Sequence, residues 1–111
     1  MRHEQENVGY RLVRLQELIF DELRSLLQDD VGDPSLQGAS ITAVVLSPDY
    51  RHARVHFALR QNGLGSEGVR EAERAFVRAT PFLRARVGDA IDLKRVPDLR
   101  FIFDAVAPQS E

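Results

Sequence analysis

Cysteine and tryptophan are absent from this chain of 111 residues, and its aromatic side chains are six phenylalanines and two tyrosines. Without cysteine there are no disulfides, thiolate metal sites or cysteine nucleophiles, which favours an intracellular protein. No apolar run approaches the roughly 20 residues that span a bilayer, and the first residues lack the apolar core of a secretory signal. The sequence therefore predicts a cytoplasmic protein with no membrane partner.

The length also limits what the chain can contain. A chain of 111 residues forms one domain with a modest core and has no room for a cofactor domain beside a substrate domain. We expect a frayed N-terminal tail at residues 1–8, one folded domain over residues 9–105 and a short C-terminal tail at residues 106–111. No cofactor, metal or small-molecule substrate is expected, and the chain is expected to act as a monomer.

Charge is distributed unevenly along the chain, although the formal net charge is only −2. Residues 1–50 carry four arginines against nine acidic residues, whereas residues 51–100 carry eleven lysines and arginines against six acidic residues. This asymmetry indicates an acidic, solvated first half and a basic working surface in the second half. An ordinary mixed surface is the alternative that composition leaves open.

The first half begins with a pattern typical of an amphipathic helix over residues 10–28, where apolar residues recur every three or four positions. Gly32 is expected to end this helix with a left-handed cap, because Asp33-Pro34 cannot continue it. The aspartates at positions 29, 30 and 33 lack the ligand spacing of a calcium loop, so a solvated turn is the better interpretation.

Two strands joined by a turn are predicted next. Residues 41–46 are apolar and β-branched, and residues 51–61 alternate between apolar and cationic side chains. Pro48 suits a central position of the turn in an antiparallel hairpin. One face of the hairpin is expected in the core and the other in solvent. The solvent face carries His52, Arg54, His56 and Arg60.

After the hairpin, the spacing of apolar residues predicts two helices separated by a kink at Ala79-Thr80-Pro81. Because Pro81 has no N–H and its ring clashes with the preceding turn, an uninterrupted helix would cost about 3 kcal/mol or more. We therefore expect a restart, with Thr80 capping the second helix and Pro81 at its first position. The aromatic residues expected in the core are Phe76, Phe82, Phe101 and Phe103.

The predicted order of elements is helix, strand, strand, helix, kink, helix, strand, with the last strand at residues 99–103. Because a helix pair precedes the last strand, we expect that strand to return to one edge of the hairpin. The order predicts an α+β domain in which the helices cover one face of a three-stranded sheet.

Two motifs raise the possibility of an enzyme, and their context supports neither. The segment Gly63–Gly68 matches G-x-G-x-x-G between a strand and a helix. A dinucleotide site needs a strand buried in a parallel sheet, whereas this strand has one solvated, cationic face, so a flexible loop is the better interpretation. His52 and His56 have no third ligand or nucleophile and are expected to be surface residues. We therefore expect no enzymatic activity.

Cationic side chains concentrate around the predicted kink. The candidate contacts are Arg70, Arg74, Arg78, Arg84, Arg86, Lys94 and Arg95, with Arg51 and Arg54 as a second tier. The first three are four residues apart and share one face of a helix. Guanidinium groups bind phosphates in a bidentate manner, which favours recognition of structured RNA through its backbone. A solvated face neutralised by Glu71 and Glu73 is the alternative.

Several short motifs occur in a specific order and spacing: Asp33-Pro34, Ala53-Arg54-Val55, Phe82-Leu83-Arg84, Leu93-Lys94 and Pro97-Asp98-Leu99. On these motifs the chain resembles the ribosome-binding factor A family, bacterial small-subunit assembly factors with a type II KH-like fold. In that family an interhelical Ala-x-Gly kink replaces the G-x-x-G loop of ordinary KH domains, and Ala79-Thr80-Pro81 occupies that place. The family's glycine is therefore Pro81 in this chain, and the arginine of its Asp-Pro-Arg motif is Ser35.

The resemblance implies a single KH-like domain that binds the small (30S) ribosomal subunit and its 16S rRNA. It further implies non-catalytic assistance to late subunit maturation and to 16S rRNA processing, and a link to cold adaptation. The cations around the kink would contact phosphates, while Ala79 to Pro81 would set the angle between the two helices. The alternative is a KH-like protein-interaction module that docks a partner through a strand edge or the acidic first helix.

Overall fold

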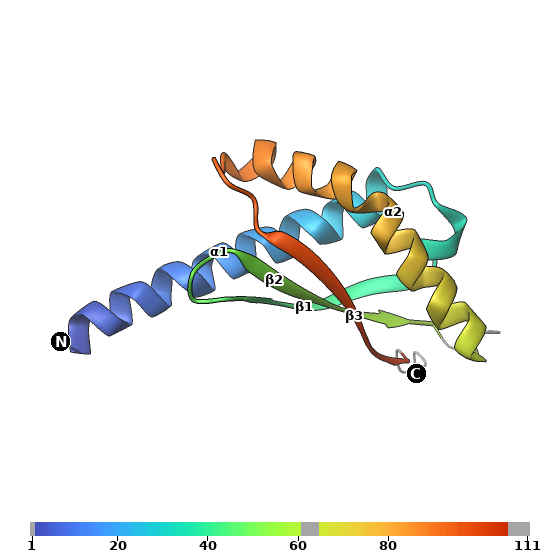
Figure 1. The fold of residues 1–111 in the computed structure, drawn as a ribbon, viewed down its shortest axis with the longest axis horizontal. Coiled ribbons are helices and arrows are strands. Elements are labelled where there is room, and N and C mark those ends of the chain that lie inside the picture. The colour runs from blue at the N-terminus through green and yellow to red at the C-terminus, as the bar shows by residue number, and fades with distance from the viewer. Residues whose placement is uncertain (1, 61–64, 107–111) are drawn as a thin grey trace.

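The computed structural model describes residues 2–60 and 65–106, with side chains for residues 9–60 and 67–104. Its elements follow in the order α1 (Arg2–Asp29), η1 (Pro34–Leu36), β1 (Ala39–Leu46), β2 (His52–Leu59), α2 (Gly65–Ile91) and β3 (Asp98–Val106), and Figure 1 labels the two long helices and the three strands. Both long helices lie on the same side of the three-stranded sheet. The predicted α+β class and layer arrangement are confirmed.

The sheet has the order β1-β2-β3, with β2 in the centre. β1 and β2 form the predicted antiparallel hairpin, whereas β3 runs parallel to β2 after the crossover through α2. The third strand therefore lies at one edge of the hairpin, as predicted. The sheet is mixed, since β2 has one antiparallel and one parallel neighbour.

The predicted turn between β1 and β2 is confirmed. The N–H of Tyr50 donates to the carbonyl of Ser47 at 2.9 Å, and Tyr50 adopts the left-handed backbone with a φ of 65°. The Asp49 carboxylate accepts hydrogen bonds from the Ser47 hydroxyl and from the backbone N–H of Arg51. These two donors lower the pKa of Asp49, because they favour its charged form. The turn is closed by side chains as well as by backbone.

The helix α1 begins at Arg2, well before the start predicted from its periodicity, and ends at Asp29. Its C-terminal half buries Ile19, Leu23 and Leu26 against the sheet and α2. The predicted left-handed cap at Gly32 is wrong, since Gly32 does not adopt the left-handed backbone. The final turn is instead closed by the N–H of Val31, which donates to the carbonyl of Leu26 at 3.0 Å.

The helix α2 is continuous, with Pro81 inside it. The predicted restart is therefore wrong: the Thr80 hydroxyl does not cap a second helix but donates to the carbonyl of Phe76 at 2.7 Å. Figure 1 shows that α2 nevertheless changes direction near its middle. Proline and a hydroxyl bonded to the preceding turn are both known causes of helix bending. The kink is thus a bend within one helix.

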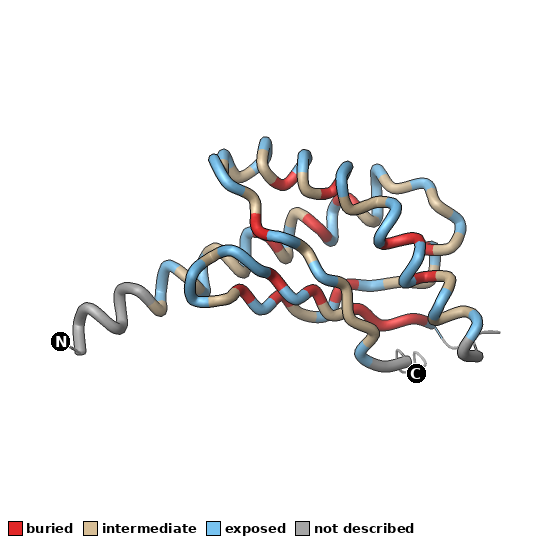
Figure 2. Tube along the Cα trace, in the orientation of Figure 1, coloured by how far each residue is buried: buried red, intermediate tan, exposed pale blue. Residues whose placement is uncertain are grey.

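The core lies between the helices and the inner face of the sheet, where the buried positions of Figure 2 gather. The ring of Phe76 stacks on that of Phe101 with a centroid separation of 4.4 Å and lies 4.7 Å from that of Phe57. Phe103 packs edge-on against Phe57. Phe82 is the exception to the predicted aromatic core, because 41% of it is exposed.

Candidate nucleic-acid interface

The first part of the interface is the solvent-facing side of α2. Arg70, Arg74 and Arg78 are all exposed and line one shallow hollow of about 420 Å³ together with Glu73 and Val77. Their spacing of four residues produces this alignment, as the sequence predicts. Val77 is 71% exposed, so the hollow combines cationic rims with an apolar floor.

Two of these arginines are engaged by carboxylates. Arg74 Nη2 lies 2.8 Å from Glu71 Oε1, and Arg78 Nη2 lies 3.0 Å from Asp33 Oδ2. The Ser35 hydroxyl donates to the other oxygen of Glu71 at 3.2 Å. The alternative of a partly neutralised face is therefore correct for Arg74 and Arg78, although their partners are Glu71 and Asp33 rather than Glu73.

Hydrogen bonds to these carboxylates lower two pKa values. The pKa of Asp33 is lowered chiefly by the backbone N–H of Ser35, with which Asp33 caps η1, and next by Arg78. The pKa of Glu71 is lowered chiefly by Arg74 and next by the Ser35 hydroxyl. Both carboxylates are thus held in the charged form that pairs with the arginines.

Arg84 and Arg86 lie beyond the bend and differ in environment. Arg84 is half-buried and donates to the backbone carbonyls of Val96 at 2.7 Å and Pro97 at 3.2 Å. Arg86 is exposed, lies 2.9 Å from Asp30 Oδ2 and stands over the ring of Phe82. The exposure of Phe82 follows from this position, since its ring supports a cation at the surface.

Lys94 and Arg95 occupy the turn between α2 and β3, and both are exposed. The turn begins where Asp92 adopts a φ of 60° and the N–H of Leu93 donates to the carbonyl of Gly88 at 3.0 Å, as in a Schellman cap. Within the described part of the chain, no ion pair joins Lys94, Arg95 or Arg70 to another residue. Of the seven candidate cations around the bend, these three are exposed and form no ion pair within the described part of the chain.

The acidic segment at the end of α1 acquires a role that the sequence did not reveal. A solvated turn is expected here, yet Asp30 and Asp33 pair with Arg86 and Arg78 across the domain. Asp33 and Arg78 are 45 residues apart in sequence, so no local pattern links them. The acidic first half therefore neutralises part of the basic second half.

The predicted kink residues lie at the middle of this surface. Ala79 is half-buried against the core, Thr80 bonds back to the preceding turn, and Pro81 is exposed. No N–H is available at position 81, so α2 has one fewer donor at its bend. The bend places the arginines before it and after it on differently directed helical segments.

The other predicted motifs lie apart from this surface. Residues 61–64 of the glycine segment fall outside the described residues, while residues 65–68 form the first turn of α2 rather than a loop. On the outer face of the sheet, His52 Nδ1 lies 3.9 Å from Asp98 and His56 Nδ1 lies 3.8 Å from Asp104. In the described residues, no group of three potential metal ligands occurs.

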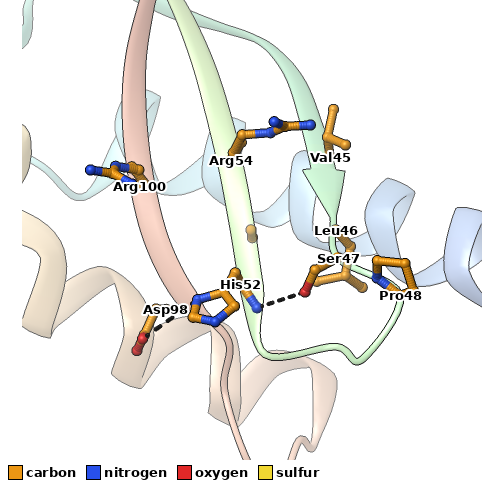
Figure 3. A pocket seen from close by; sticks show the side chains of 9 residues that line it. Val45, Leu46, Ser47, Pro48, His52, Arg54, Asp98 and Arg100 are labelled. Carbon is orange, nitrogen blue, oxygen red and sulfur yellow. Dashed lines mark hydrogen bonds and ion pairs between the residues drawn. The ribbon is translucent and has the colours of Figure 1, made fainter.

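The open face of the sheet contains a second cationic site that includes one residue the sequence reasoning missed. Arg54 and Arg100 are partners in the parallel register of β2 and β3, and Val45 is the partner of Arg54 in β1. Figure 3 shows these three side chains lining a hollow of about 600 Å³. The alternation of β3 places Arg100 outward, but only the observed register brings it beside Arg54.

The helices give no sign of a membrane span: neither α1 nor α2, as far as the chain is described, has an apolar stretch long enough to cross a bilayer.

Comparison with known proteins agrees with the fold. The family model of ribosome-binding factor A matches residues 11–111. Ribosome-binding factor A of Dechloromonas aromatica is 39% identical over 92 residues, which cover 83% of this chain and 72% of that protein. The crystal structure of ribosome-binding factor A from Thermus thermophilus has a TM-score of 0.72 and 25% identity, and the match covers 83% of this chain and 93% of that one.

A second structural match concerns the Thermus factor in a complex. A homology model of Thermus thermophilus ribosome-binding factor A, fitted into the cryo-EM map of a 30S complex with that factor, has a TM-score of 0.59 and 27% identity. This match covers 76% of the present chain and 85% of the Thermus chain. The matched family model and the identity to the Dechloromonas factor together show that this chain belongs to the ribosome-binding factor A family.

Proposed function

We propose that this protein binds the small ribosomal subunit through its 16S rRNA and assists late maturation of that subunit without catalysing a reaction. The observation that carries the proposal is the coincidence of family membership with a line of exposed cations along α2 and the turn after it. The Thermus factor that was fitted into a 30S complex supports the same partner. Processing of 16S rRNA, adaptation to cold, a cytoplasmic location and a monomeric state belong to this proposal.

The length of the cationic line favours structured RNA as the ligand. At a rise of about 1.5 Å per residue, Arg70 and Arg78 are separated by roughly 12 Å along one face of α2, and Arg86, Lys94 and Arg95 follow beyond the bend. A row of that length suits several phosphates of a folded RNA, because guanidinium groups recognise backbone phosphates without reading the bases. The aromatic rings of Phe76 and Phe101 are in the core, where they cannot stack on unpaired bases.

The contacts divide into three kinds. Arg70, Lys94 and Arg95 contact phosphates directly. A second group, Arg74, Arg78 and Arg86, binds phosphates only after each arginine leaves its carboxylate partner. The lost ion pair reduces the net contribution of these arginines to the binding free energy. Arg84 is a positioning residue, since its guanidinium holds the segment next to Lys94 and Arg95.

The mechanism is conformational. A protein that binds one rRNA conformation more tightly than another shifts the population toward that conformation, and it does so without breaking or forming a covalent bond. The factor stabilises a minor arrangement of the immature subunit and dissociates when the mature arrangement no longer offers the same phosphates.

The test is co-sedimentation with purified small subunits over a salt series. The variant Arg70→Gln, Lys94→Gln, Arg95→Gln removes the three cations proposed to contact phosphates directly. Its matched control, Arg11→Gln, Arg14→Gln, Arg24→Gln, removes three exposed cations from α1. We expect the first variant to reduce the slope of log affinity against log salt by about two to three, since each phosphate contributes about 0.7 to 0.9.

Three results would count against the proposal. Failure of the wild type to sediment with small subunits at low salt would refute ribosome binding. Equal effects of the two triple variants would refute the assignment of the contacts to α2 and its turn. Binding that hardly depends on salt would favour the alternative of a protein partner at a strand edge or on α1.

A further inference from the structure

We infer that the open face of the sheet is a second phosphate-binding site, in which Arg54 and Arg100 contact two successive phosphates of an RNA strand. This inference rests on the proposed function, because it takes the ligand to be rRNA. It concerns the side of the molecule opposite to α2, where the notable feature is a pair of arginines on neighbouring strands.

The backbone register of β2 and β3 places the two arginines side by side. Arg54 and Arg100 are register partners in a parallel ladder, where neighbouring strands lie about 4.8 Å apart. Both residues are exposed, and in the described part of the chain neither forms an ion pair. Like charges at partner positions repel one another, so this arrangement destabilises the isolated sheet slightly. A phosphate bound at each guanidinium offsets this repulsion.

The direction of the side chains suits two phosphates better than one. Figure 3 shows the two guanidiniums turned to opposite sides, that of Arg54 toward Val45 and that of Arg100 away from it. The pair therefore spans the hollow rather than converging on its centre. Consecutive phosphates along an RNA strand provide two anionic groups held a short distance apart, and each guanidinium can bind one of them bidentately.

The surroundings of the pair are compatible with a sugar–phosphate backbone. Val45, which is 37% exposed, and Pro48 line the same hollow of about 600 Å³ and present apolar surface to a ribose. One carboxylate also lines the hollow: the oxygens of Asp98 lie 3.9 Å from His52 Nδ1, which belongs to the same lining, and 3.8 Å from Arg84 Nη2. The two guanidiniums outnumber this carboxylate, so the lining of the hollow has a net positive charge.

A second site on the opposite face changes what the domain can do. Phosphate contacts along α2 and on the open sheet face are separated by the thickness of the sheet and the core. One rigid domain that binds RNA on both faces fixes two RNA segments relative to each other. Linked sites of this kind raise the overall affinity only when both segments adopt the matching arrangement, which gives selectivity for one conformation.

The experiment compares Arg54→Gln, Arg100→Gln with the matched control Arg11→Gln, Arg14→Gln in the co-sedimentation assay with small subunits over a salt series. We expect the sheet variant to lose about tenfold or more in affinity near 0.1 M salt and to reduce the salt slope by about 1.4 to 1.8, as two lost phosphate contacts require. The control should behave as the wild type. The midpoint temperature of thermal unfolding of the sheet variant should equal that of the wild type or be slightly higher, because the repulsion between the two arginines is removed.

Three other outcomes would overturn the second site. An unchanged affinity and slope in the sheet variant, with a weakened Arg70, Lys94, Arg95 variant, would overturn the second site and leave the proposed function in place. A loss of affinity with an unchanged salt slope would show that the pair meets a protein rather than phosphates. Failure of the wild type itself to bind small subunits would refute the proposed function and this inference with it.

Discussion

Arg84 holds the backbone of Val96 by a hydrogen bond of 2.7 Å from Nη2 to the carbonyl oxygen. Nε of the same guanidinium donates to the carbonyl of Pro97 at 3.2 Å. Both carbonyls belong to the segment between α2 and β3, so one side chain fastens the helix to the start of the last strand. The fork geometry of a guanidinium is what allows two consecutive carbonyls to be bound at once.

Replacing Arg84 should therefore affect stability. We expect Arg84→Leu to lower the free energy of unfolding by about 2–3 kcal/mol, because two carbonyls lose a charged donor. Arg84→Lys should be intermediate, since an ammonium group cannot reproduce the fork. Urea denaturation at neutral pH measures both. The control is Arg70→Leu, an exposed substitution on the same helix that should change stability by less than about 0.5 kcal/mol. Equal stability of the Arg84→Leu and Arg70→Leu proteins would contradict this role.

The role of Arg84 also shows what sequence reasoning can and cannot reach. Periodicity identified the helices, the hairpin and the last strand, because apolar spacing is a local property of the chain. The spacing of Arg70, Arg74 and Arg78 likewise predicted their common face. An arginine can contact a carbonyl, a carboxylate or solvent, and the outcome depends on which distant segments pack beside it. Local spacing along the sequence does not predict those contacts.

Two further features of the structure differ from the sequence prediction, because they too depend on contacts between distant segments. Arg54 and Arg100 lie side by side because β3 joins the sheet in a particular parallel register, which nothing within either strand specifies. Pro81 favours a helix break by local rules, yet the helix continues through it, since Phe76 and Leu83 on the two sides are both buried in one core. Tertiary packing outweighs the local penalty at that position.

The pairing of Asp33 with Ser35 and Arg78 predicts a specific response to acid. The pKa of Asp33 is lowered below the ordinary value of 3.8, so its contribution to stability is fully present above that value and is lost as pH falls through the lowered one. We expect Asp33→Asn to be less stable than the wild type at neutral pH, and the difference to shrink as the solution is acidified. Urea denaturation from about pH 7 to about pH 3 measures this difference.

The control for the acid response is Asp21→Asn, which changes an exposed aspartate of α1. This variant should follow the pH dependence of the wild type. If the difference between wild type and Asp33→Asn stays constant down to the lowest pH, the carboxylate does not stabilise the fold through its charge.

Gly88 lies where α2 approaches the segment that leads into β3. A Cβ at this position would come within 2.8 Å of Val96 Cγ2. Val96 is β-branched and cannot turn away easily. We expect Gly88→Ala to lower the free energy of unfolding by about 1 kcal/mol, although alanine is favoured over glycine in a helix interior by a similar amount.

A double-mutant cycle identifies the cause. If the methyl groups clash, Val96→Ala should relieve the cost of Gly88→Ala, with a coupling free energy of about 1 kcal/mol in urea denaturation. Strict additivity of the two substitutions would show that the backbone moves to accommodate the new methyl group, and that the close approach at Gly88 is not needed.

Pro81 provides the final test, because it is exposed and lies inside a continuous helix. Proline is less favourable than alanine by about 3 kcal/mol in a helix interior, and glycine by about 1 kcal/mol. The bend already relieves part of the proline penalty. We therefore expect Pro81→Ala to raise the free energy of unfolding by about 1–2 kcal/mol, and Pro81→Gly to lie about 1 kcal/mol below Pro81→Ala.

Stability and subunit binding together locate the origin of the bend. If both variants are stable and bind small subunits as the wild type does, packing around Ala79 and Leu83 sets the bend, and the proline only stiffens it. If Pro81→Ala is instead less stable than the wild type, the proline fits a curvature that the core requires, because a straighter α2 would draw either Phe76 or Leu83 away from the sheet.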